Sequence, residues 1–161
     1  MSTHGADSLP PASGDLSQQL AALRDRIDRE MPRNTPGRPV STEAVGGWSK
    51  LGARLDGVLR ALFEALCAEH RLDPAATWQR GTQTPWDRAT AGMVAHMLTN
   101  AWVAAESQHP VVRALLADLR SSASALRAVI ACRNALVHDR PPPLEHLEAL
   151  VRLRALLSAL V

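Results

Sequence analysis

Residues 110–139 read PVVRALLADLRSSASALRAVIACRNALVHD, and this stretch decides the fold class. Its apolar residues recur every three or four positions, which is the period of an α-helix that buries one face. Pro110 suits the first turn of such a helix, and the prolines at 141–143 end it. The sequence therefore predicts one long helix with an apolar stripe formed by Val112, Leu116, Leu119, Ala123, Leu126 and Ile130.

The next positions of that stripe are Arg133 and Val137, so a guanidinium lies where a leucine would be expected. Burying a charge without a partner is costly. We therefore expect Arg133 to be paired, to reach a helix end, or to line a polar cleft between helices or subunits. Asn134 follows directly, and His138 lies one helical turn after Asn134. These features make Arg133, Asn134 and His138 the candidate catalytic residues.

The three side chains suit the cleavage of RNA, which carries its own nucleophile, the 2'-hydroxyl, beside each phosphodiester. Such cleavage needs no metal or other cofactor, because one group moves a proton and another neutralises charge on the phosphoryl oxygens. Histidine is the residue type whose reference pKa lies near neutrality, which suits position 138 to proton transfer, and Arg133 presents a bidentate donor fork. Asn134 could orient the imidazole or donate to a phosphate oxygen. The structural alternative for His138 is a cation near a helix C-terminus, favoured by the helix dipole.

The hexapeptide from Arg133 to His138 resembles the signature of the HEPN family: an arginine, a polar residue that is often asparagine, a few mostly apolar residues, then a histidine. The resemblance covers residues 48–161 and implies an all-α bundle of about four to five helices. It also implies a metal-independent endoribonuclease that works as a homodimer, its two motifs facing across a shared cleft. A bacterial defence or toxin role follows from the same resemblance, with an antitoxin or defence-system protein as partner.

Helix geometry bears on how Arg133 and His138 can act together. Residues five apart in a straight helix lie about 140° from each other around the axis, so the two side chains of one chain do not converge. Either the helix is distorted there, or two copies of the chain pool their residues.

Three segments precede the HEPN-like domain at 48–161. Residues 1–14, rich in Ser, Pro and Gly, are expected to be disordered. Residues 15–31 are predicted to form an additional N-terminal helix, and residues 32–47 a proline-containing linker. The domain itself is expected to contain helices near 49–70, 84–107, 110–138 and 144–161, with Trp78 in a loop. The apolar face of the N-terminal helix consists of Leu16, Leu20, Leu23 and Ile27.

Arginines recur every seven residues along the predicted long helix, and their line continues into the hexapeptide. This line predicts a track for an RNA backbone that leads to the candidate site. The alternative is a solvated helix face in an arginine-rich chain. The predicted RNA-binding residues are Arg113, Arg120, Arg127 and Arg140.

Composition limits the other possibilities. The formal net charge is only +2, so any contact with RNA is expected to be local. The N-terminus lacks the pattern of a secretory signal and no segment is apolar enough for a membrane span, which predicts a cytoplasmic protein without a membrane partner. Cys67 and Cys132 lie on apolar faces and are expected to be buried. The rival to the nuclease is a catalytically silent helical interaction module in which Arg133 pairs with an acidic partner inside an interface.

Overall fold

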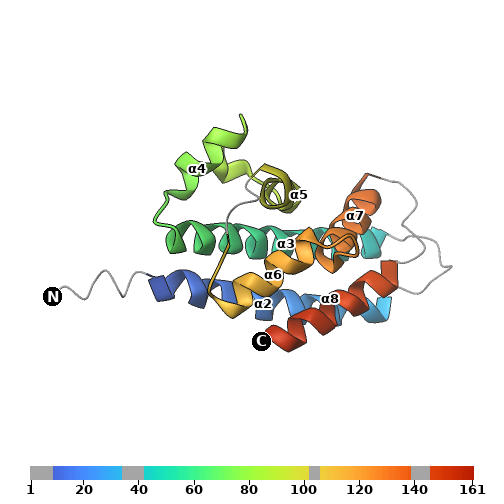
Figure 1. Ribbon diagram of the computed structural model, residues 1–161. Helices are drawn as coiled ribbons and strands as arrows, with labels where there is room; N and C mark the ends of the chain where they lie inside the picture. Colours follow the sequence, from blue (N-terminus) through green and yellow to red (C-terminus); the bar gives the residue numbers. More distant parts are fainter. Residues whose placement is uncertain (1–8, 34–41, 102–105, 139–145) are drawn as a thin grey trace.

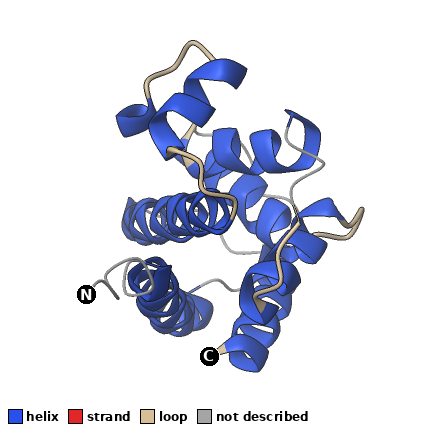
Figure 2. Cartoon of the chain, turned by 60° about the vertical axis from the view of Figure 1, so that its left-hand side comes forward, coloured by secondary structure: helices blue, strands red, loops and turns tan. Residues whose placement is uncertain are grey.

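The computed structural model describes residues 9–33, 42–101, 106–138 and 146–161. These residues form seven α-helices, α2 to α8, and no strand (Figures 1 and 2), which confirms the predicted all-α class. α3 (Thr42–Glu69) is the longest helix and lies between two layers. α2 (Leu9–Glu30) and α8 (His146–Leu160) lie on one side of α3, whereas α4 (Pro74–Gly81) and α5 (Ala91–His96) lie on the other.

α2 belongs to the main bundle. Its predicted apolar face is confirmed, because Leu16, Leu20, Leu23 and Ile27 are at most 1% exposed and pack along α3. The predicted segment boundaries are wrong in two places: α2 begins at Leu9, within the stretch expected to be disordered, and α3 begins at Thr42, within the expected linker. Both beginnings contain Pro or Gly, whose weak helix propensity favours a loop when the sequence is considered alone.

Trp78 lies in a short helix, α4 (Pro74–Gly81), and the prediction that it lies in a loop is wrong. Asp73 caps α4 by accepting a 2.8 Å hydrogen bond from the Ala76 N–H. Trp78 is 1% exposed, meets Phe63 edge-on, and donates from Nε1 to the Thr84 carbonyl at 2.7 Å. Trp78 is therefore a core residue that leaves almost no ring surface for a base of RNA to stack on.

The helix predicted near residues 84–107 is shorter and starts later. A 3₁₀ turn spans Trp86–Arg88, α5 spans Ala91–His96, and a π-helical turn spans Met97–Ala101. The start of α5 is fixed from outside the segment, because the Ala91 N–H donates to Asp56 Oδ1 of α3 at 2.6 Å. A propensity argument within the segment cannot detect that contact.

Residues 110–137 form two helices, and the prediction of one continuous helix is wrong. α6 spans Pro110–Arg120 and α7 spans Ala125–Val137. Ser124 caps α7 by accepting from the Arg127 N–H at 3.1 Å, and Asp118 accepts from the Ser124 hydroxyl and from the N–H groups of Ala125 and Leu126. These side-chain acceptors replace the carbonyls that a continuous helix would have offered.

α8 packs against α7 and α2 and closes the core. Leu150, Leu153 and Leu157 are fully buried, whereas Val151 on another face is 48% exposed. Across the described ranges, no helix combines the length and the apolar character needed to cross a membrane.

Both cysteines are buried, as predicted. Burial raises the pKa of the Cys67 thiol to about 12, although a hydrogen bond with Thr77 acts in the opposite direction. Cys67 therefore remains a neutral thiol at physiological pH and serves as a small apolar core residue.

Candidate active site

Arg133 extends from α7 across the surface of α3 at Gly52. A Cβ atom at Gly52 would lie 2.4 Å from Arg133 Nε, so only glycine lets the guanidinium approach the α3 backbone this closely. Arg133 and Asn134 line a small pocket, about 30 Å³, together with Asp56 and Thr90. The arginine that interrupts the apolar stripe thus lies at a polar pocket between α3, α5 and α7, one of the three placements that the sequence predicts.

The charge of Arg133 is not neutralised by an ion pair with any residue that the structure describes. Its Nη1 donates to the neutral amide of Asn134, at 2.9 Å from Oδ1, and its buried Nε has no hydrogen-bond partner within the described ranges. Asp56 lines the same pocket, but the hydrogen bond of its carboxylate goes to the Ala91 N–H. A half-buried guanidinium without a carboxylate partner is a site that favours an anion.

His138 ends α7. Its backbone N–H donates to the Asn134 carbonyl at 3.1 Å, and its imidazole is exposed. The ring makes no hydrogen bond or ion pair with the described part of the chain. The imidazole is therefore free to meet a ligand or a second copy of the chain.

Arg133 and His138 lie in different surroundings within a single chain. Arg133 points to Gly52 at the inner side of α7, whereas His138 is exposed at its C-terminal end. The Asn134 side chain accepts from Arg133, so it does not hold the imidazole as the sequence suggested. Since α7 is α-helical up to Val137, helix distortion does not bring the two groups together.

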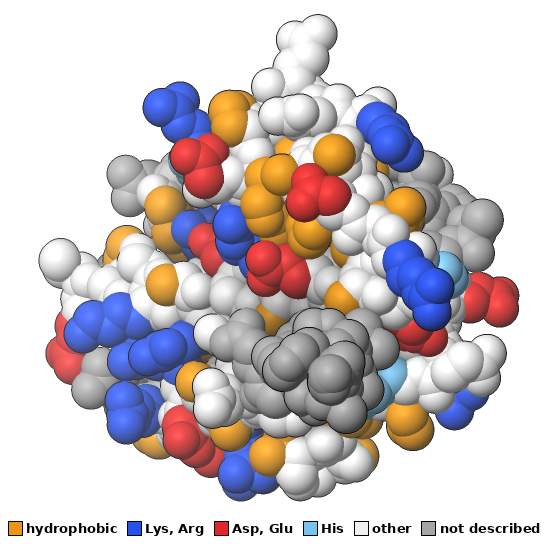
Figure 3. Space-filling model, turned by 90° about the vertical axis from the view of Figure 1, so that its left-hand side faces the viewer, with side chains coloured by type: hydrophobic (Ala, Val, Ile, Leu, Met, Phe, Trp, Pro, Cys, Tyr) orange, Lys and Arg blue, Asp and Glu red, His pale blue; other side chains and the backbone are white. Residues whose placement is uncertain are grey.

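The predicted arginine track is broken by the gap between α6 and α7. Arg113 and Arg120 are exposed on α6, while Arg127 lies on α7 and donates to the Leu119 and Ser121 carbonyls at the end of α6. Arg127 therefore satisfies the free carbonyl groups at the C-terminus of α6. Arg140 lies outside the described residues. On the face shown in Figure 3, which is the left-hand side of the view in Figure 1, several basic side chains gather at the lower left.

Gly52 and Asp56 line the pocket around Arg133, and the helical pattern of the sequence predicts neither of them as a site residue. A glycine inside a helical apolar pattern is a weak signal of close packing, and Gly52 is such a glycine. Asp56 shows no comparable signal, because one carboxylate on a helix is ordinarily solvated.

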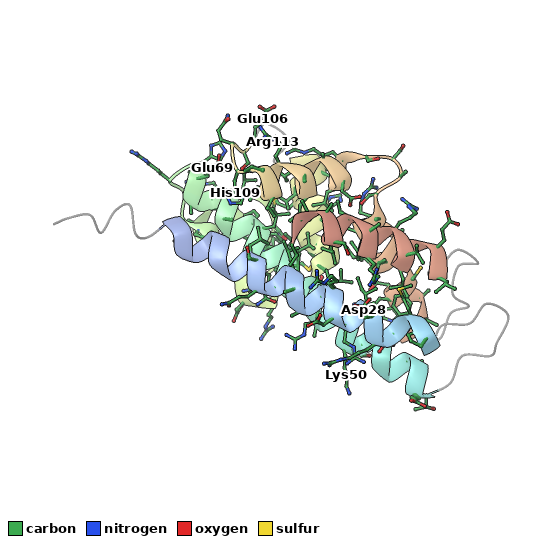
Figure 4. All side chains as sticks on the ribbon, turned by 90° about the horizontal axis from the view of Figure 1, so that it is seen from below. Asp28, Lys50, Glu69, Glu106, His109 and Arg113 are labelled. Carbon is green, nitrogen blue, oxygen red and sulfur yellow. The ribbon has the colours of Figure 1, made fainter. Side chains whose placement is uncertain are left out.

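A second polar cluster joins the end of α3 to the start of α6 (Figure 4). Glu69 accepts from the Ser107 hydroxyl at 2.5 Å and from the Gln108 N–H at 2.6 Å. Burial alone would raise the pKa of Glu69, but these hydrogen bonds and the nearby His70 and His109 hold it below its ordinary value of 4.5. The cluster fastens α6 to α3 and lies at the end of α3 away from Gly52.

Glu69→Gln should destabilise the protein at neutral pH and not in acid. A carboxyl whose folded-state pKa is lowered stabilises the fold above its unfolded pKa, and that contribution is lost as the pH falls through the folded value. Urea unfolding at pH 7 and at pH 3 measures the effect, with Glu106→Gln as an exposed control from the same junction. An equal destabilisation by Glu69→Gln at both pH values would show that the carboxylate charge contributes nothing.

Comparison of the chain with protein-family profiles, with curated proteins and with solved structures gives no match.

Proposed function

We propose that this protein is a metal-independent, HEPN-like endoribonuclease in which Arg133 and His138 act on one phosphodiester. One observation carries the proposal: a half-buried guanidinium without an ion-pair partner in the described chain lies five residues before an exposed imidazole without a side-chain partner there. One group is suited to hold phosphoryl oxygens and the other to move a proton.

In the proposed reaction the RNA 2'-hydroxyl attacks the adjacent phosphorus, and the bond to the 5'-oxygen breaks. The products are a 2',3'-cyclic phosphate and a 5'-hydroxyl, with one proton moved from the nucleophile to the leaving oxygen. His138 transfers that proton, and Arg133 stabilises the negative charge that grows on the non-bridging oxygens. Asn134 holds the Arg133 fork through its amide oxygen.

The proposed site is composite, with Arg133 from one copy of the chain and His138 from another. This arrangement is supported by the divergence of the two side chains within one chain. It is also supported by Val137, which is 36% exposed directly before His138 and offers apolar surface for a second copy. We further propose a cytoplasmic defence or toxin role, held in check by an antitoxin or defence-system protein.

The second candidate is a catalytically silent interaction module. It is favoured by the contact of Arg133 with Gly52, which gives the arginine a packing role in its own chain. In that case the exposed His138 is a cation at the C-terminus of α7, where the helix dipole favours positive charge.

The test is cleavage of a labelled single-stranded RNA in the presence of EDTA. We expect cleavage to persist, to leave a 2',3'-cyclic phosphate, and to fail on 2'-O-methyl RNA and on DNA, because only RNA supplies the nucleophile. Strict dependence on magnesium, or cutting of DNA, would contradict this mechanism. Absence of cleavage under all conditions favours the interaction module.

A further inference from the structure

A second basic surface lies between α2 and α3. A groove of about 290 Å³ is lined by Asp25, Arg26 and Arg29 of α2 and by Lys50 and Arg54 of α3, with two alanines between them. Four cations and one carboxylate face the same space, although the whole chain carries a formal charge of only +2. Lys50 lies at the outer edge of the α2–α3 pair, far from Glu69, His109 and Arg113 (Figure 4).

Most of the positive charge in the groove has no ion-pair partner among the described residues. Arg26 is the exception, because it pairs with Glu30, a carboxylate that is fully buried. Arg29, Lys50 and Arg54 make no side-chain hydrogen bond or ion pair with any described residue. Even Arg26 retains a buried Nε without a hydrogen-bond partner in the described part of the chain. The groove therefore has free donors and positive charge that an anion would satisfy.

The arrangement of the cations fits two neighbouring phosphates. Arg26 and Arg29 are about one helical turn apart on α2, and so are Lys50 and Arg54 on α3, which gives a site roughly 5 Å long with cations on both sides. No aromatic residue lines the groove, so it offers no platform for a base. A ligand that binds here is recognised by its phosphates, as a nucleic-acid strand is, and not by its base or sequence.

The groove is separate from the candidate active site. Lys50 and Arg54 are each two residues from Gly52, so they lie roughly 160° around the α3 axis from the position that Arg133 covers. A strand held by Lys50 and Arg54 follows the opposite side of α3 from Arg133 of the same chain.

We infer that the α2–α3 groove binds the phosphate backbone of a single-stranded nucleic acid, independently of its sequence. That the strand is RNA rests on the proposed function, whereas the recognition of its phosphates does not. The low net charge predicts that any contact with RNA is local, and the groove is a local surface of that kind. It replaces the broken arginine track as the surface that holds the strand.

The experiment measures binding of a mixed-sequence 12-nucleotide single-stranded RNA by fluorescence anisotropy over a range of salt concentrations. All proteins carry His138→Ala, so cleavage does not interfere. The groove variant combines Arg29→Gln, Lys50→Gln and Arg54→Gln. The matched control loses the same charge from three exposed arginines outside the groove: Arg71, Arg80 and Arg88 are each replaced by glutamine.

We expect the groove variant to bind roughly ten- to a hundredfold more weakly at low salt, and the slope of log Kd against log salt to fall by about 2, since each phosphate contact in a single strand contributes about 0.7. The control should bind within about threefold of the unsubstituted groove, and single-stranded DNA should bind about as well as RNA. An equal loss in the control, or no RNA binding at all, would overturn the inference. Binding without cleavage by the wild-type protein leaves the groove standing and rejects only the nuclease.

Lys50 provides an independent readout, because it is the single lysine of the sequence. Bound RNA should protect Lys50 from an amine-acetylating reagent, as read by peptide mass spectrometry, while the N-terminal amine serves as the internal reference. Inorganic pyrophosphate at the same phosphate concentration should protect Lys50 far less. Equal protection by pyrophosphate would show a site for small anions, and an unprotected Lys50 would contradict the inference outright.

Discussion

Replacing His138 with alanine should reduce RNA cleavage by roughly a hundred- to ten-thousand-fold, the usual contribution of a general acid–base group. The fold should survive, because the imidazole is exposed at the end of α7 and makes no side-chain hydrogen bond within the described ranges. Initial cleavage rates in EDTA, together with thermal unfolding of the same preparation, give the two quantities needed.

His96→Ala is the matched control for His138→Ala. His96 is also exposed, but it lies on α5 and its Nδ1 contacts the Asn100 amide at 3.0 Å. We expect His96→Ala to cleave RNA as fast as the wild-type protein. Full activity in His138→Ala would remove the imidazole from the mechanism and leave it as a helix-terminal cation.

Arg133→Lys should retain the fold and lose activity by about a hundred- to a thousandfold, a loss comparable to removing one donor that stabilises transition-state charge. Lysine keeps the positive charge, but it lacks the planar fork that binds two phosphoryl oxygens and the Asn134 amide together. Gel-filtration mass and cleavage rate should be measured on the same samples.

Arg133→Ala separates the nuclease from the interaction module. In the nuclease it should be inactive but still assembled, because within the described chain Arg133 has no carboxylate partner whose charge would be stranded. In the module, the loss of Arg133 strands an acidic partner and costs roughly 3–5 kcal/mol of assembly. Loss of the assembled form in Arg133→Ala, with no RNA cleavage by the wild-type protein, would favour the module.

The periodic features of the fold could be predicted from the sequence. The buried face of α2 follows from the helical spacing of its Leu and Ile side chains. The apolar stripe of α6 and α7 follows in the same way, except at Ala123, which is exposed between the two helices. The half-buried position of Arg133 also follows, since a charge within an apolar stripe needs a polar surrounding. These inferences depend only on the neighbours of each residue along the chain.

The errors arose where distant residues fix local structure. α5 begins at Ala91 because Asp56, 35 residues earlier, accepts its N–H. The break between α6 and α7 depends on Asp118 and Ser124, whose side chains accept the N–H groups at the start of α7. Helical periodicity does not predict the α2–α3 groove. The groove joins charged residues from two helices, whereas periodicity describes only one helix at a time.

A composite site predicts that a dimer of two different inactive variants regains an intact site. A dimer of one Arg133→Lys chain and one His138→Ala chain has one site with two defects and one site that is fully intact, if each site takes Arg133 from one copy and His138 from the other. The two chains, carrying different affinity tags, can be co-expressed and the mixed dimer isolated by two successive purifications.

The decisive measurement is RNA cleavage by that mixed dimer in EDTA, compared with each variant alone. Our account predicts that two inactive variants together recover roughly half of the wild-type rate per dimer, from the one intact site of two. A mixed dimer as inactive as its parents, or a wild-type chain that is active as a monomer, would contradict a site shared between Arg133 and His138 of two copies.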